Sequence, residues 1–180
     1  MIWWVTAHVI GTVLGVGAAT INDVLFMRAI GSTEEGEAYR RYNGTLSLVA
    51  WVGITILAAS AMYFWIQMPG IHGSEKILTK IGLTALLALN GLAMHMLLRP
   101  RVMSMKPADW KDAGKLDWVK SVGVPLGVLS AVSWYTALIL GAVGRTSWGY
   151  EQILPYYFAA LIGGIVVGRL LVDYKLKRLR

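Results

Sequence analysis

The sequence predicts an all-α integral membrane protein, a five-helix bundle with its N-terminus outside and its C-terminus inside. Three observations lead to this fold class. First, 56% of the 180 residues are hydrophobic and only 15% are charged, whereas charged residues make up about a quarter of an ordinary soluble domain. Second, five apolar runs approach the length of about 20 residues that a helix needs to cross a bilayer. Third, Lys and Arg gather in alternate connecting segments.

The five apolar runs are separated by segments that hold most of the Gly, Pro, Asn and charge. Two of these, GSTEEGEAYRRYNG and RPRVMSMKPADWKDAGKLDWVK, are expected to be connecting loops at the membrane surface. No basic residue precedes the first run, so we expect a retained helix there rather than a cleaved signal peptide. A single transmembrane domain over 1–180 is predicted, with helices over 3–29, 45–67, 77–98, 121–143 and 153–173.

The distribution of basic residues predicts the orientation. Of the 17 Lys and Arg, only Lys76, Lys80 and Arg145 fall on one side of the predicted topology, and the rest fall on the other. Loops rich in Lys and Arg remain in the cytoplasm. We therefore expect a multi-pass protein of the cell inner membrane, with the lipid bilayer as its partner. Because topology explains the net charge of +7, no nucleic-acid partner is expected.

The first predicted helix divides into a face of small and polar residues and a face of branched apolar ones, at about 100° per residue. Gly11 and Gly15, like Gly164 and Gly168 in the last span, fit the small-xxx-small pattern that lets helices approach closely. We expect them to pack helices within one chain; a homo-oligomer or a larger membrane complex is the alternative. The small and polar face comprises His8, Gly11, Thr12, Gly15, Ala18, Ala19, Asn22, Asp23 and Phe26.

Spans three and four show comparable faces, which we expect to point into the bundle. They contain Lys80, Thr84, Leu87, Asn90, Gly91, Met94 and His95 in span three, and Gly123, Gly127, Ser130, Ser133, Trp134, Ala137, Gly141 and Gly144 in span four.

Ionisable groups in a bilayer are costly and usually face a bundle interior, so each is a candidate site residue. His8 and His72 are expected near the outer surface. There a neutral His8 imidazole is suited to ligate haem iron or a metal ion, with His72 as a second ligand. The glycines beside His8 would let a flat macrocycle lie against the helix backbone. The alternative is a His8 hydrogen-bonded to a neighbouring helix and a His72 in water.

A second group of polar residues is expected near the inner surface. One interpretation is a path for protons or small solutes. Another is a soft-metal site for copper, in which His95 acts with nearby methionines and is an alternative cofactor ligand. A structural interpretation is equally open, with Asp23 paired to Arg28 or Arg99 and the methionines filling packing gaps. The polar path comprises Asn22, Asp23, Asn90 and His95.

The stretches HVIGTVLGVGAATINDVLF and LALNGLAMH resemble small bacterial membrane proteins that are distantly similar to the membrane domains of copper-resistance D proteins and to membrane haem-b cytochromes. The likeness covers a little over the first half of the chain. It implies redox or metal handling in a helical bundle, with His8 as the best-matched ligand. The three histidines lie at different levels, so at most one bis-histidine haem is compatible; a five-coordinate or His/Met haem is equally so.

Three functions are therefore expected in turn. The first is binding of haem b, or of copper, for electron transfer or sensing, through His8, His72 or His95. The second is a small channel or transporter for protons or small solutes. The third is an accessory subunit of a membrane complex with no chemistry of its own. No hydrolytic triad and no phosphate-binding glycine loop is present in the sequence.

Overall fold

The computed structural model describes residues 1–143 and 148–178, which form an all-helical bundle. Five helices are long and apolar enough to cross a membrane, so the chain is a multi-pass membrane protein and the predicted fold class is confirmed. Gly144, Arg145 and Arg180 lie outside the described residues. The elements are α1 (Ile2–Ala29), α2 (Thr33–Gln67), η1 (Pro69–Ile71), α3 (Glu75–Ala93), η2 (Met94–Leu98), α4 (Arg99–Ser104), η3 (Pro107–Lys111), α5 (Ala113–Trp118), η4 (Val119–Gly123), α6 (Val124–Ala142) and α7 (Tyr150–Lys177).

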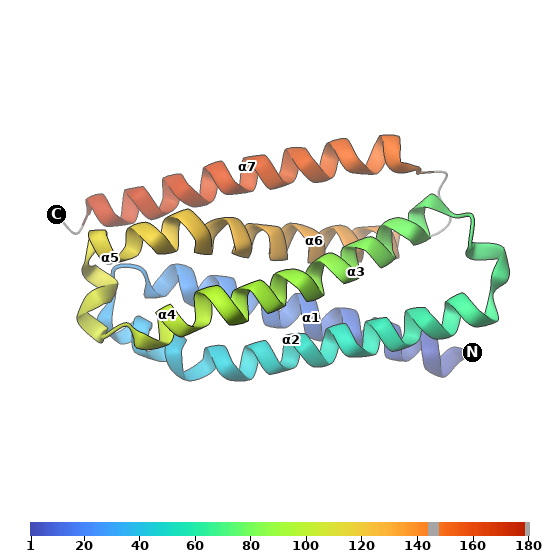
Figure 1. Ribbon diagram of the computed structural model, residues 1–180, viewed down its shortest axis with the longest axis horizontal. Helices are drawn as coiled ribbons and strands as arrows, with labels where there is room; N and C mark the ends of the chain where they lie inside the picture. The colour runs from blue at the N-terminus through green and yellow to red at the C-terminus, as the bar shows by residue number, and fades with distance from the viewer. Residues whose placement is uncertain (144–147, 179–180) are drawn as a thin grey trace.

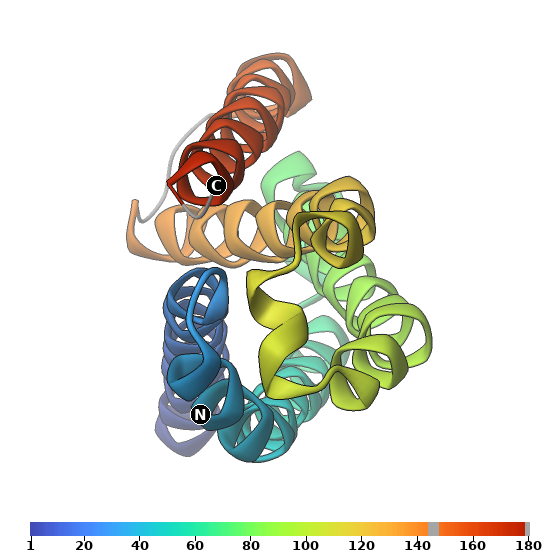
Figure 2. The same cartoon turned by 90° about the vertical axis from the view of Figure 1, so that its left-hand side faces the viewer.

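The two termini lie at opposite ends of the bundle (Figure 1). We call the end with the C-terminus the basic end, because most of the Lys and Arg lie there, and the opposite end the amino-terminal end. Helices α1, α2, α3 and α6 contact one another around a common interior, and α7 packs on the outside of α6. Figure 2 looks onto the basic end, where the segment between α4 and α5 crosses the bundle.

Helix α2 begins earlier than predicted. Ser32 is its N-cap, and the Ser32 hydroxyl accepts a hydrogen bond from the backbone N–H of Glu35 at 3.3 Å. A serine at this position, followed by acidic residues in the first turn, stabilises a helix start. Residues 33–44, which the density of charge placed in a loop, are therefore helical.

A proline lies inside the third span. Pro100 has no N–H to donate, and in a regular α-helix its ring would clash with the carbonyl four residues earlier. The helix accommodates it through the π-helical turn η2, at whose end the backbone N–H of Arg99 donates to the carbonyl of Met94. Such turns widen a helix locally and rotate the residues that follow.

Pro125 is preceded by a π-helical turn in the same way. At the end of η4 the backbone N–H of Val124 donates to the carbonyl of Val119. The fourth span thus begins at Ala113 and runs through this proline, whereas the sequence pattern placed its start near 121. Residues 99–104, also expected in a loop, extend the third span.

Helices α1 and α2 approach each other closely at three glycines. A Cβ atom on Gly53 would lie 2.8 Å from the carbonyl oxygen of Gly11 and 2.9 Å from the backbone nitrogen of Gly15. On the other side of the bundle, a Cβ on Gly164 or Gly168 would lie within 2.7 Å of a valine on α6. Both small-xxx-small pairs therefore pack helices within this chain.

Replacing Gly53 with alanine should destabilise the bundle by about 1–3 kcal/mol, because the new methyl group meets backbone atoms that cannot rotate away. Gly17 on α1 is the matched control, since a Cβ there meets nothing within 4 Å. Thermal unfolding in detergent should show a lower midpoint for G53A and an unchanged or higher one for G17A. Equal midpoints for the two variants would refute this close approach.

The buried apolar residues form three clusters along the bundle axis. The cluster at the basic end contains Trp110, which is fully buried although its position near a predicted span end suggested an interfacial side chain. It contacts Tyr39 edge-on, with 5.8 Å between the ring centroids. The segment between α4 and α5 therefore closes part of the basic end, and the middle cluster lies further in, around Trp134.

Candidate functional site

A cavity of about 90 Å³ lies inside the bundle, between α1, α2, η2, α4 and α6. Its polar lining includes Asn22 and Asp23 from α1, Asn43 from α2, and His95 and Arg99 from the third span. Because His95 is exposed, the cavity extends from the interior to the protein surface beside η2. This volume has room for several water molecules or a small solute.

A hydrogen-bonded network of amides and a phenol forms one wall of the cavity. The Asn43 side-chain amide, only 8% exposed, donates to Asn22 Oδ1 at 2.8 Å and to the Tyr39 hydroxyl at 3.0 Å. The Tyr39 ring is held between Phe26, at 5.6 Å between centroids, and Trp110. Aromatic packing therefore fixes the hydroxyl at the cavity wall.

The Asp23 carboxylate has no partner of opposite charge. Its Oδ1 faces α6, 3.6 Å from the position of a Cβ on Gly127. In residues 1–143 and 148–178 it makes neither a hydrogen bond nor an ion pair. The two expected partners are engaged elsewhere: Arg28 pairs with Glu35, and Arg99 bonds to a histidine. The structural interpretation of Asp23 as an interfacial ion pair is therefore wrong.

Arg99 and His95 form the cationic side of the same cavity. The guanidinium donates a hydrogen bond to His95 Nδ1 at 3.2 Å. It also lies across α2 at Gly44, where a Cβ would be 3.6 Å from Arg99 Nη2. Over the described residues Arg99 has no carboxylate partner. His95 and Asp23 thus line one cavity, as their depth along the helices allowed, but no hydrogen bond joins them.

Asn90, the fourth residue of the expected polar path, lies behind the cavity wall. It is 4% exposed, and its amide donates to the backbone carbonyl of Leu126 on α6 at 3.0 Å. Its Oδ1 is buried and has no hydrogen-bond partner in the part of the chain that the structure describes. Asn90 therefore joins α3 to α6, while its helix neighbours Gly91 and Met94 line the cavity.

Trp134 closes the cavity on the side of the amino-terminal end. The tryptophan is 2% exposed and packs with Ile54, Leu57 and Leu87. Its ring fills the space that a side chain on Gly15 would occupy, because a Cβ there would lie 1.9 Å from Trp134 Cη2. A buried apolar layer thus separates the polar cavity from the amino-terminal end.

His8 lies beyond this layer, toward the amino-terminal end. The Ser60 hydroxyl lies 2.8 Å from His8 Nδ1 and also donates to the carbonyl of Ile56 at 2.8 Å. A hydroxyl that donates its one hydrogen to a carbonyl must accept from the imidazole, so His8 is protonated on Nδ1. Its ring also meets Phe64 edge-on, and the ammonium group of Lys80 interacts with it electrostatically.

His72 is held in the connection between α2 and α3. Its ring stacks on Trp65 with 4.2 Å between centroids, and its Nε2 lies 2.7 Å from the Trp65 carbonyl. Over the described ranges, no three His, Cys, Asp or Glu side chains come together as a metal site. His8 retains an Nε2 atom free to ligate. Haem b and copper binding through His8, His72 or His95 stays a prediction.

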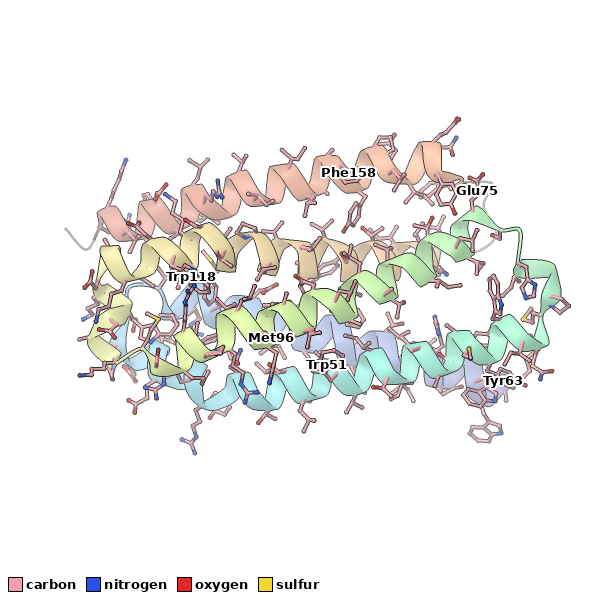
Figure 3. All side chains as sticks on the ribbon, viewed as in Figure 1. Trp51, Tyr63, Glu75, Met96, Trp118 and Phe158 are labelled. Carbon is pink, nitrogen blue, oxygen red and sulfur yellow. The ribbon has the colours of Figure 1, made fainter. Side chains whose placement is uncertain are left out.

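The sequence analysis missed two residues of the cavity wall, Tyr39 and Asn43. Both fell in a segment expected to be a loop. The signal that finds them is the four-residue spacing of Tyr39, Asn43, Ser47 and Trp51, which places all four on one face of α2. Trp51 extends from α2 toward α3, where a Cβ on Gly91 would lie 3.3 Å from its Cζ2 (Figure 3).

Comparisons of the chain with protein-family models, with curated proteins and with solved structures give no significant match. The resemblance to copper-resistance D and haem-b cytochrome domains therefore stays a prediction from the sequence. The functional argument depends on the cavity itself.

Proposed function

We propose that the chain is a small carrier of the cell inner membrane, which binds a polar solute in the cavity and reaches it from the basic end. The observation that carries this proposal is the Asp23 carboxylate, which faces a polar cavity within a membrane-spanning helix and has no partner among the described residues. A polar group without a partner in a bilayer is costly and marks a substrate or ion pathway. A bound solute would supply the missing partner.

The arrangement along the bundle axis favours a carrier over an open channel. The cavity extends toward the basic end, and Trp134 with its apolar neighbours blocks it on the other side. Beyond that layer lie further polar groups, His8 with Ser60 and the nearby Lys80. A closed layer between two polar regions is what alternating access requires, whereas a channel needs a continuous polar path.

The proposal is tested by labelling a single cysteine from the basic end. The chain contains no native cysteine, so Ser130→Cys places one thiol in the cavity lining. Ser133→Cys, three residues away on α6, is the matched control, because Ser133 is fully buried and its hydroxyl lies 2.9 Å from that of Tyr157 on α7. A membrane-impermeant, charged thiol reagent should label S130C and leave S133C unlabelled.

Labelling is measured in proteoliposomes of known orientation. Absence of labelling at S130C from the basic end, in protein that elutes as a single folded species, would show that the cavity is closed to water there. The proposed carrier function would then be wrong.

A further inference from the structure

We infer that the solute is a small zwitterion, a molecule with both an amine cation and a carboxylate or similar anion. This inference rests on the proposed function, because it identifies the class of solute that the same cavity would take.

The cavity carries one group of each charge, and neither is neutralised by the protein. The Asp23 carboxylate makes no ion pair in the described part of the chain, and neither does the Arg99 guanidinium. Both line the cavity, and they do not pair with each other. The two groups therefore leave space between them for a ligand that contacts each one.

The neutral groups on the wall do not compete for these charges. His95 accepts a hydrogen bond from Arg99 at Nδ1, so its remaining proton is on Nε2 and the ring is uncharged. The Asn43 amide donates to Asn22 and Tyr39, so it is already engaged within the wall. The electrostatic selection thus falls to Asp23 and Arg99 alone.

A ligand with a single charge meets repulsion from one of the two groups. A simple cation gains from Asp23 and is repelled by Arg99, and a simple anion meets the opposite problem. Such repulsion between charges in a poorly screened cavity discriminates among ligands as strongly as attraction does. A zwitterion is attracted by both groups, and the volume of about 90 Å³ limits it to a small one.

The test compares glycine and β-alanine with two analogues that keep one charge each: glycinamide, which keeps the cation, and N-acetylglycine, which keeps the anion. The readout is protection of S130C from the thiol reagent at equal ligand concentration. We expect at least one zwitterion to slow labelling by about tenfold or more, and each analogue to slow it less than about twofold.

Charge-removing variants in the S130C background identify the groups responsible. Arg99→Gln should allow glycinamide to protect, and Asp23→Asn should allow N-acetylglycine to protect. Arg101→Gln is the matched control, because Arg101 is exposed and lies over the Trp118 ring, 4.2 Å from its centroid, outside the cavity lining. It should leave protection by all four ligands unchanged.

The outcomes separate this inference from the proposed function. If an analogue protects as well as both zwitterions, or if no ligand protects while S130C is still labelled, the zwitterion inference is overturned and the open cavity stands. If S130C is not labelled at all, the proposed function itself fails.

Discussion

Trp134→Ala should connect the cavity to the amino-terminal end of the bundle. The ring is the largest side chain of the apolar layer that includes Ile54, Leu57 and Leu87. Its removal beside Gly15, which has no side chain to fill the gap, leaves a hole next to the cavity. In the S130C background, a thiol reagent applied from the amino-terminal side should label the cysteine rapidly, and small solutes should leak down their gradients.

The same change costs stability, because Trp→Ala substitutions in packed cores typically lose about 3–5 kcal/mol. Trp134→Leu keeps an apolar side chain, so it should fold more readily and show an intermediate labelling rate. Trp110→Ala is the control: this tryptophan is equally buried but belongs to the cluster at the basic end. It should destabilise without opening the amino-terminal side. Unchanged labelling from that side in both Trp134 variants would contradict the assignment of the barrier.

Asp23→Leu should raise the thermal stability of the protein while it abolishes solute binding. The carboxylate has no partner in the described residues, and leaving a buried polar group unsatisfied costs about 1–3 kcal/mol. Leucine removes this cost, and the adjoining cavity has room for its extra methyl group. Residues kept for function often reduce stability in this way.

Asp173→Leu is the control for this prediction. Asp173 on α7 pairs with Lys120 of η4, so its removal should leave the midpoint of thermal unfolding unchanged or lower it. The measurement is thermal unfolding in detergent, together with protection of S130C by glycine. A lower midpoint for D23L than for the unsubstituted chain would show that Asp23 has a structural role.

The number and type of the helices follow from the sequence because hydrophobic length is a strong signal. The helix boundaries at the basic end do not. The charge between Thr33 and Gly44 suggested a loop although Ser32 is a good N-cap. Pro100 and Pro125 suggested helix ends, but a π-helical turn before each lets the helix continue. Local composition gives no sign of these turns.

The cavity was only partly foreseen. Helical periodicity placed Asp23 and His95 at one depth, and the structure places both in the cavity lining. Tyr39 and Asn43 were missed because their segment was not expected to be helical. The contact of Arg99 with His95, which leaves Asp23 unpaired, depends on helix rotation after η2. Sequence spacing alone does not give that rotation.

The most direct test of the carrier is labelling of S130C from the amino-terminal side in a chain that retains Trp134. Alternating access predicts slow labelling that still goes to completion, at a rate well below that from the basic end. Glycine or β-alanine should alter this rate as either occupies the cavity. If no labelling occurs from the amino-terminal side while the basic end labels completely, the cavity opens to one side only, and transport across the membrane is contradicted.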